Sequence, residues 1–337
     1  MALLTPLAHD KARQLLLEWG LQLHELRALE AGSVNSNFLF STEDGQGYFA
    51  RIYEEQGPSG AFFELELNER LNHVGVPVAL PVRKLDGGLL DAVEGKPFAI
   101  YQQVRGESIC QKMVTPREAH AVGEALARVH QADLQGLEIP AGRFDQAGIE
   151  ERLALIWASE RSELRAAVEE VRELLKEVAD WRAAQANSLP QGLIHGDLFK
   201  DNILLESPLP ADRSPQVTAL LDFESACFGP YVYDLMVTLL AWCFGESLSP
   251  ELGGAMIAGY HQVRPLSELE VAAMVPEGCF AAARFATTRM TDFSLRVAPG
   301  HAPGRDYRRF FQRAEALKSG ALASAVKIAL GSSAAVL

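Results

Sequence analysis

The feature that most constrains the fold is a pair of short strand-like segments in a half of the chain that is otherwise mostly helical. The first is GLIHGDLFKDNILLE (192–206), in which apolar runs flank a polar cluster. The second is VTALLDFESACFG (217–229), in which apolar residues lead up to Asp222. The polar, proline-rich stretch between them predicts a hairpin loop. Such a hairpin would bring Asn202 and Asp222 close together.

The first hundred residues have a different character. Short strand-like runs end at glycine-containing turns, and they flank one segment with helical spacing, FFELELNERLNHVG (62–75). The later patterns are mostly helical, as in 116–131 and 149–186. We therefore expect an α+β fold with two lobes. Residues 1–103 would form an antiparallel-sheet N-lobe with one inserted helix, and residues 104–337 a larger, mainly helical C-lobe.

Composition and charge exclude several classes of protein. The chain has 31 Lys and Arg against 44 Asp and Glu, so it lacks the basic footprint that nucleic-acid binding needs. The start of the chain has no basic segment followed by a long apolar core, and the most apolar helix candidate, YDLMVTLLAWCFG (233–245), is too short to cross a membrane. The four cysteines form no CxxC pair. We expect a cytoplasmic monomer or homodimer that binds neither nucleic acid nor membrane.

The polar cluster suggests a specific chemistry. Asn202 and Asp222 combine an amide oxygen with a carboxylate, and such oxygen ligands suit Mg²⁺, which keeps waters and substrate phosphates in its shell. Asp197 lies five residues before Asn202, near the metal without needing to bind it. A free carboxylate in this place can accept a proton from an attacking hydroxyl group. Phosphoryl transfer requires these two elements, a metal ion against phosphate charge and a positioned base.

Several motifs together resemble one enzyme superfamily. HGDLFKDN (195–202) followed by DFE (222–224) has the spacing of the catalytic and metal-binding residues of protein kinases, with glycine in place of their arginine. The chain resembles the aminoglycoside phosphotransferase/choline kinase superfamily and, within it, is most similar to the bacterial homoserine kinases of that fold. The other matching motifs are EAGSVNSNFLFSTEDG (30–45), ELELNERLNHVGVPVALPV (64–82), EGKPFAIYQQVRGE (94–107) and RFATTRM (284–290).

The resemblance implies a protein-kinase-like fold, ATP and Mg²⁺ as cofactors, and transfer of the γ-phosphoryl group to a hydroxyl of a small molecule. L-homoserine is the first candidate acceptor, as in threonine biosynthesis. Other acceptors of the superfamily stay open: an aminoglycoside, choline or ethanolamine, hydroxylysine, or a protein serine. A polycationic aminoglycoside would suit the acidic surface. A nucleotide-binding regulator without activity is a third reading, against which the intact Asp197, Asn202 and Asp222 argue.

Carried over to this chain, the resemblance assigns roles around the polar cluster. Asp197 is the expected catalytic base, and Asn202 and Asp222 are the expected metal ligands. Three further residues are expected to support the loop, and one of them, the lysine, could also touch the γ-phosphate. These are His195, Lys200 and Asp234.

The resemblance also implies where the two substrates bind. GSVNSNF (32–38) resembles a phosphate-covering loop, although it is not a GxGxxG sequence. Its candidate contacts to the nucleotide are Ser33, Asn35 and Asn37. Arg51 stands where kinases have a lysine, and Glu64 of the following helix is its expected ion-pair partner. The backbone of Gln102 and Val104 is expected to contact the adenine.

For an amino-acid acceptor, both charged groups need partners. Glu224 is the candidate partner of the ammonium group. Arg284 and Arg289 lie five residues apart on an expected helix, and either could bind the carboxylate.

Overall fold

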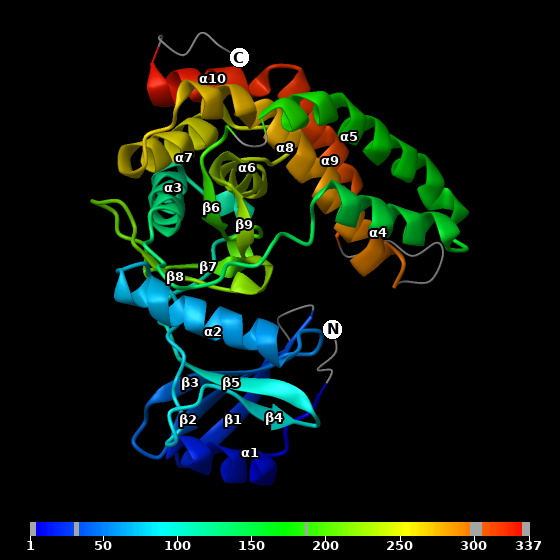
Figure 1. Cartoon of the computed structure of the whole chain (residues 1–337). Coiled ribbons are helices and arrows are strands. Elements are labelled where there is room, and N and C mark those ends of the chain that lie inside the picture. Colours follow the sequence, from blue (N-terminus) through cyan, green and yellow to red (C-terminus); the bar gives the residue numbers. More distant parts are fainter. Residues whose placement is uncertain (1–4, 30–33, 186–187, 297–304, 332–337) are drawn as a thin grey trace.

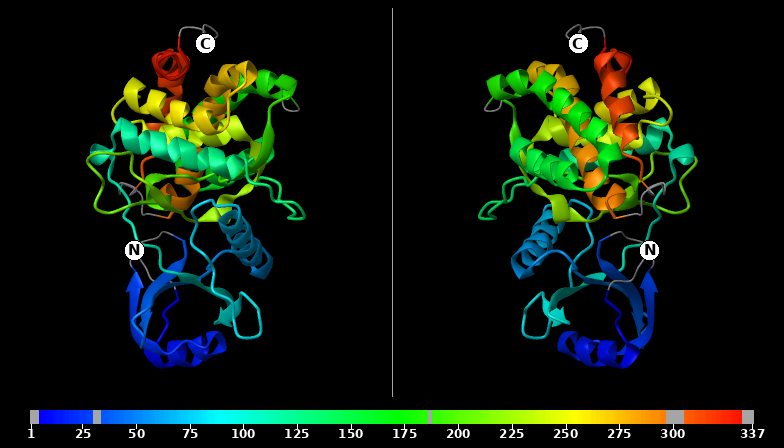
Figure 2. Two further views of the ribbon diagram at one scale, coloured as in Figure 1. Left: turned by 90° about the vertical axis from the view of Figure 1, so that its left-hand side faces the viewer. Right: turned by 90° about the vertical axis from the view of Figure 1, so that its right-hand side faces the viewer.

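The computed structural model describes residues 5–29, 34–185, 188–296 and 305–331. Figures 1 and 2 show two lobes, one above the other, with the N-lobe built around a five-stranded antiparallel sheet of order β1-β2-β3-β5-β4. Its strands are β1 (Leu23–Leu29), β2 (Ser36–Thr42), β3 (Gly47–Ile52), β4 (Asp91–Val93) and β5 (Lys96–Gln102). Its helices are α1 (His9–Leu16) and α2 (Pro58–His73).

The two helices of the N-lobe cover opposite faces of the sheet. Successive side chains of a strand point to opposite faces, so one face packs Phe38 against Leu16 of α1 and the other packs Ala99 against Leu65 of α2. The second face turns toward the C-lobe, and α2 lies between the sheet and that lobe (Figure 1). Pro58 begins α2, as its fixed φ favours, and the chain turns away at Gly75 with φ of 81°.

The C-lobe is mainly helical, and it contains two small two-stranded sheets, one of which adjoins the N-lobe (Figure 1). Its helices are α3 (Pro116–His130), α4 (Gln146–Ala158), α5 (Arg165–Gln185), α6 (Tyr231–Trp242), α7 (Pro250–Val263), α8 (Glu268–Arg289), α9 (Arg308–Lys318) and α10 (Ala321–Leu330). Its strands are β6 (Gln191–Ile194), β7 (Ile203–Leu205), β8 (Val217–Leu220) and β9 (Cys227–Pro230). The protein is therefore α+β, with a sheet-based lobe and a helical lobe, as the sequence predicts.

Helix α6 is the centre of the C-lobe core. All its residues from Val232 to Trp242 are buried, which explains why its sequence is apolar without an amphipathic stripe. In the described part of the chain, no helix combines the length and the apolar character needed to span a membrane. Helices α3 and α7 pack unusually closely, because a side chain on Gly123 would lie 2.1 Å from the backbone oxygen of Met256.

The hairpin expected between the two strand-like segments is present. β7 and β8 are antiparallel, with Ile203 opposite Leu220. The second segment differs from the expectation, because it forms two strands that belong to different sheets. Asp222 lies between β8 and β9 with φ of 65° and ψ of 63°, in the left-handed region that aspartate tolerates better than most residues. The chain turns there, and β9 pairs with β6 instead of continuing β8.

Candidate active site

Residues 195–202 form the loop that the resemblance predicts to be catalytic, and we call it the catalytic loop. It leaves the end of β6 and returns through a single-turn helix into β7. The imidazole of His195 is completely buried and holds the loop through both ring nitrogens. Its Nε2 donates to the backbone oxygen of Leu221 at 3.0 Å, and its Nδ1 accepts from the backbone N–H of Asp197 at 3.3 Å. These bonds occupy both nitrogens, so His195 positions Asp197 and has none left for a substrate.

Asp234, in the first turn of α6, fixes the other side of the catalytic loop. Its buried carboxylate accepts the backbone N–H groups of His195 at 2.7 Å and Gly196 at 2.8 Å, and the Nε2 proton of His130 at 3.0 Å. Burial alone raises the pKa of Asp234, but the hydrogen bonds from His130 and Gly196 outweigh it, so the pKa lies below its usual value. Asp234 therefore holds the backbone of the loop at His195 and Gly196.

The His130 contact makes the protein sensitive to acid. Burial lowers the pKa of His130 below its usual 6.5, so on acidification the unfolded chain binds the proton before the folded chain does. The stabilisation from the neutral imidazole is complete above pH 6.5, and it is lost as the pH falls through the lowered pKa. We expect the free energy of unfolding, measured by chemical denaturation, to be smaller at about pH 5.5 than at about pH 7.5.

A matched pair of variants isolates this effect. His130→Gln should show a smaller decrease between the two pH values than the wild type. His73→Gln, which changes an exposed histidine, should behave like the wild type. Equal decreases in the wild type and in His130→Gln would contradict the assignment.

Asp197 has the environment of a proton acceptor. Its side chain is 36% exposed, and Nη1 of Arg284 lies 3.6 Å from its Oδ1. Burial raises the pKa of the Asp197 carboxyl group, and the nearby charge of Arg284 opposes that shift. A carboxylate with a raised pKa accepts a proton more readily than one in water.

Arg284 contacts the catalytic loop, which suits it to position that loop more than to bind an acceptor. It is 3% exposed, and its Nη1 donates to the backbone oxygen of Gly196 at 2.8 Å. Its guanidinium lies over the rings of Phe144 and Phe285, at 4.3 and 3.8 Å from their centroids. The structure thus places Arg284 beside Asp197, in contacts that hold it there.

Asn202 and Asp222, the expected metal ligands, lie at the adjoining ends of β7 and β8. The backbone N–H of Leu221 donates to the backbone oxygen of Asn202 at 2.9 Å, which ties the two segments together. The Nδ2 of Asn202 donates to the backbone oxygen of Asp197 at 2.8 Å, so its Oδ1 is the atom that remains for a ligand. The side chain of Asp222 is 34% exposed, with Oδ1 3.2 Å from Nη1 of Arg51.

These donors fit Mg²⁺ better than a metal that needs a closed cage of protein ligands. Among the residues that the structure describes, no group of three or more His, Cys, Asp and Glu side chains could hold a metal ion. Mg²⁺ is commonly held by one or two protein oxygens together with substrate phosphates and water. One amide oxygen and one carboxylate on neighbouring strand ends meet that requirement.

Arg51 links the N-lobe to the metal-ligand candidate. Its Nη1 lies 3.3 Å from Oε1 of Glu64, so the ion pair expected from the sequence is formed. Its Nε donates to Oδ1 of Asn37 at 3.3 Å. Burial raises the pKa of Glu64 to about 8, and the charge of Arg51 opposes that shift. Arg51 thus makes charged contacts with an acid from each lobe, Glu64 and Asp222.

The other residues expected to contact the nucleotide differ in how far their polar groups are already hydrogen-bonded. Ser33 lies outside the described residues. The side chain of Asn35 is already bonded, since its Nδ2 donates to Oε2 of Glu224 at 3.1 Å and its Oδ1 accepts from the backbone N–H of Glu54 at 3.1 Å. The backbone N–H of Gln102 donates to the oxygen of Leu80 at 2.9 Å. For the adenine, this leaves the Gln102 carbonyl and the backbone N–H of Val104.

Glu224 lies where the two lobes meet. Its side chain is 11% exposed, and its Oε1 is 4.0 Å from Nη2 of Arg143. Burial raises its pKa, and the neighbouring charge of Asp222 adds to that shift. Glu224 therefore lies beside the metal-ligand candidate, with Asn35 of the N-lobe on one side and Arg143 of the C-lobe on the other.

Lys200 and Arg289 lie on the C-lobe side of the loop. The Nζ of Lys200 donates to Oε1 of Gln111 at 2.7 Å and to the backbone oxygen of Ala241 at 2.5 Å, near the end of α6. These bonds turn Lys200 toward the C-lobe, which suits support of the loop more than contact with a phosphate. Arg289 ends α8, and the charges of Asp197 and Asp201 act on it.

Sequence reasoning missed two residues of this region. His130 gave no local signal, because its contact with Asp234 depends on how α3 packs against α6. Arg313, in α9, is buried close enough to Lys200 to influence its pKa. Its spacing of four residues from Arg309 on a helix was the one available indication.

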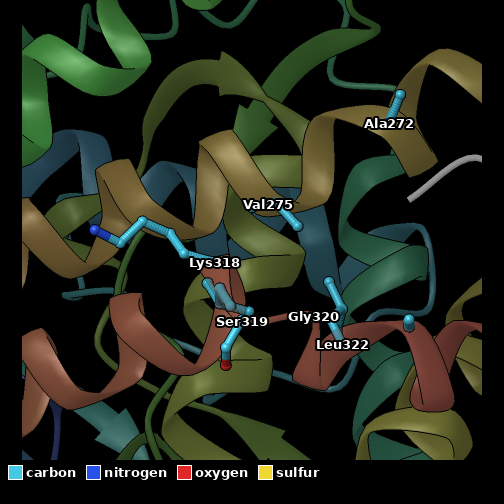
Figure 3. Close-up of a pocket in the computed structure, with 8 residues that line it drawn as sticks. Ala272, Val275, Lys318, Ser319, Gly320 and Leu322 are labelled. Atoms are coloured by element: carbon cyan, nitrogen blue, oxygen red, sulfur yellow. The ribbon is translucent and has the colours of Figure 1, made fainter.

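A cavity of about 420 Å³ lies among α8, α9 and α10 (Figure 3). Its walls are formed by Ala272, Val275, Leu317, Lys318, Ser319, Gly320, Leu322 and Ala323. The residues of the catalytic loop and the metal-ligand candidates are absent from its lining. We therefore do not assign it to the reaction.

The fold and the site are those of kinase-like phosphotransferases. A sheet-based lobe lies over a helical lobe, the loop carries a carboxylate, and two oxygen donors lie on neighbouring strand ends. Comparison with known proteins narrows this class. The chain belongs to the phosphotransferase enzyme family, whose sequence model matches residues 25–269.

Curated relatives are similar over most of their length. The chain is 32% identical to the homoserine kinase of Methylocella silvestris, over 83% of this chain and 84% of that protein. It is 34% identical to the homoserine kinase of Beijerinckia indica, over 82% of each chain. It is 31% identical to the homoserine kinase of Neisseria meningitidis serogroup B, over 88% of this chain and 93% of that protein.

Solved structures share the fold at lower identity. The amicoumacin kinase hAmiN, in complex with AMP-PNP, Ca²⁺ and Ami, has a TM-score of 0.65 at 17% identity, covering 93% of this chain and 95% of that chain. The ethanolamine kinase of Plasmodium vivax has a TM-score of 0.62 at 14% identity, covering 95% and 89%. At these identities the likeness concerns the fold alone.

Proposed function

We propose that the protein is an ATP-dependent homoserine kinase that converts L-homoserine to O-phospho-L-homoserine. The observation that carries this proposal is the identity of 31–34% to eight curated homoserine kinases, over 81–89% of this chain. The contacts around Asp197, Asn202 and Asp222 support it, because they supply the chemistry that this reaction needs. Since the reaction consumes ATP and a free amino acid, we infer a cytoplasmic location.

Asp197 is the proposed catalytic base. The hydroxyl oxygen of homoserine forms a bond to the γ-phosphorus of ATP, while the bond from that phosphorus to the bridging oxygen of ADP breaks. The hydroxyl proton passes to the carboxylate of Asp197, whose raised pKa favours its acceptance. His195 and Asp234 keep this carboxylate in place through the loop backbone.

Asn202 and Asp222 are the proposed ligands of Mg²⁺. When bound there, Mg²⁺ would neutralise the charge of the transferring phosphoryl group. Arg51 is proposed to contact the phosphates of ATP while Glu64 holds its guanidinium in position. The Gln102 carbonyl and the Val104 N–H are proposed to bind the adenine edge.

Glu224 is the proposed partner of the substrate ammonium group. It lies two residues after Asp222, on the loop that leads into β9. Among the described residues its one ion pair is with Arg143, at the long distance of 4.0 Å, and the charge of Arg51 acts on it from farther away. A substrate ammonium group could therefore become its closer partner.

The acceptor is identified by measuring kcat/KM for ADP formation with a panel of hydroxyl compounds at saturating MgATP. We expect kcat/KM for L-homoserine to exceed that for choline, ethanolamine or an aminoglycoside by about 100-fold or more, because those acceptors leave charged groups of the site unpaired. A higher value for one of these compounds would replace homoserine as the substrate. ATP binding without turnover of any acceptor would indicate a regulator.

A further inference from the structure

Two arginines beside the catalytic loop, one buried and one partly buried, lack the acidic partners that other such arginines of this protein have. Arg289 ends α8 and Arg313 lies in α9. Their guanidinium carbons lie 5.2 and 4.5 Å from the centroid of the Phe310 ring, so both stack on one aromatic side chain. We call Arg289 and Arg313 the arginine pair.

The arginine pair contrasts with two partly buried arginines elsewhere in the protein. Arg264 has Glu270 at 2.7 Å, and Arg182 has Glu277 at 3.1 Å. In the described part of the chain, neither member of the pair has an ion-pair partner, and the Nε of each is buried without a hydrogen bond. The exposed fraction of Arg313 is only 8%.

Unpaired buried guanidinium groups are costly, because each loses its water without a compensating partner. Burial and the charge of Arg289 lower the pKa of Arg313 to about 10. The two guanidinium groups therefore repel each other, and they also lack an anionic partner. The nearby acid Asp201 is already paired with Arg305 at 2.8 Å. An anion from outside the chain would resolve this imbalance.

The position of the arginine pair points to the acceptor side of the reaction. Arg289 lies five residues after Arg284, which contacts Asp197, and the charge of Asp197 itself acts on Arg289. The guanidinium carbon of Arg289 also lies 5.8 Å from the centroid of the Phe199 ring, and Phe199 stands in the same loop, two residues after Asp197. In an extended homoserine, the hydroxyl oxygen and the carboxylate carbon are roughly 5 Å apart, given bond lengths near 1.5 Å. The carboxylate must therefore bind within a short distance of Asp197.

We propose that Arg289 and Arg313 bind the carboxylate of the phosphoryl acceptor, with Lys200 as a further positive charge beside them. This inference rests on the proposed function and assigns a subsite within it. It also separates the arginines of α8, since Arg284 positions the catalytic loop and Arg289 binds substrate. A carboxylate between two guanidinium groups would accept charge-assisted hydrogen bonds from both.

The test compares two acceptors that differ only in the carboxylate. These are L-homoserine and 3-aminopropan-1-ol, which has the same hydroxyl and amine. For Arg313→Met, we expect kcat/KM with L-homoserine to fall about 100-fold, mainly through KM, because charge-assisted hydrogen bonds are lost. With 3-aminopropan-1-ol, kcat/KM should match that of the wild type. Arg308→Met, which changes an exposed arginine of the same helix, should leave both values unchanged.

Two outcomes would overturn the subsite. One is an equal loss for both acceptors in a variant whose melting temperature and ADP affinity match the wild type. The other is an unchanged kcat/KM for homoserine. If Arg313→Met does not fold, Arg289→Met is subjected to the same comparison and the same two outcomes. A wild-type enzyme that does not phosphorylate homoserine would contradict the proposed function instead. Failure of the subsite and failure of the proposed function are therefore distinguishable.

Discussion

Replacing Asp197 with alanine should lower kcat by about 1,000-fold, the size of effect typical for loss of a positioned general base. The affinity for ADP should stay close to that of the wild type. The reason is geometric, because the Asp197 side chain is partly exposed beside Arg284, whereas the proposed adenine and phosphate contacts come mainly from the N-lobe. Steady-state kinetics measures the first effect, and calorimetric titration with ADP measures the second.

Two further variants make this prediction specific to the proton acceptor. Asp197→Asn keeps the shape of the side chain but removes its basicity, so it should lose nearly as much activity as the alanine variant. Asp201→Ala serves as the control, because Asp201 lies in the same loop and its side chain is 57% exposed in a surface pair with Arg305. The base assignment fails if Asp197→Asn retains a kcat near that of the wild type.

Replacing either metal-ligand candidate should change the dependence of activity on Mg²⁺. For Asp222→Asn and for Asn202→Ala, we expect the Mg²⁺ concentration at half-maximal activity to rise about tenfold or more, since each removes one of few protein oxygens. The effect should be larger for Asp222, which contributes a charge. Activity measured across a Mg²⁺ titration at fixed ATP provides the test.

A control on the same hairpin separates metal binding from folding. Thr218→Ala removes a side chain of β8, four residues before Asp222, whose hydroxyl donates to the backbone oxygen of Leu204 at 3.2 Å. Its Mg²⁺ titration should match that of the wild type. Unchanged titrations in both Asp222→Asn and Asn202→Ala would refute the metal site.

The central part of the site could be predicted from sequence because its residues lie close together in the chain. The spacing of Asp197 and Asn202 is local, and a single hairpin brings in Asp222. The pairing of Arg51 with Glu64 also follows from local order, since a strand and the next helix pack together in the N-lobe. Only short-range geometry was needed in each case.

The remaining contacts could not be predicted because they depend on how distant helices pack. His130 meets Asp234 only through the packing of α3 against α6. The sequence suggested Arg284 as a free substrate ligand, but its contact with Gly196 follows from the position of α8 beneath the loop. Arg313, a proposed substrate ligand, lies in α9, over 100 residues after the loop. The segment 217–229 divides into two strands because the backbone of Asp222 is in the left-handed region. The strand propensity of its neighbours does not reveal that conformation.

The arginine at position 51 departs from the lysine of kinases without abolishing the arrangement around it. Its guanidinium lies between the rings of Phe49 and Tyr53, 5.8 Å from each centroid. One nitrogen reaches both Glu64 and Asp222, which a planar guanidinium can do from a buried position. The substitution therefore keeps a permanent charge at the junction of the two lobes.

The proposed reaction of this site is transfer of the γ-phosphoryl group of ATP to the hydroxyl of homoserine. Phosphorus NMR of the purified protein with MgATP and L-homoserine tests it most directly. We expect one equivalent of a phosphomonoester for each ADP formed, and no such signal from Asp197→Ala over the same period. Formation of inorganic phosphate instead, at a rate that does not depend on homoserine, would contradict it.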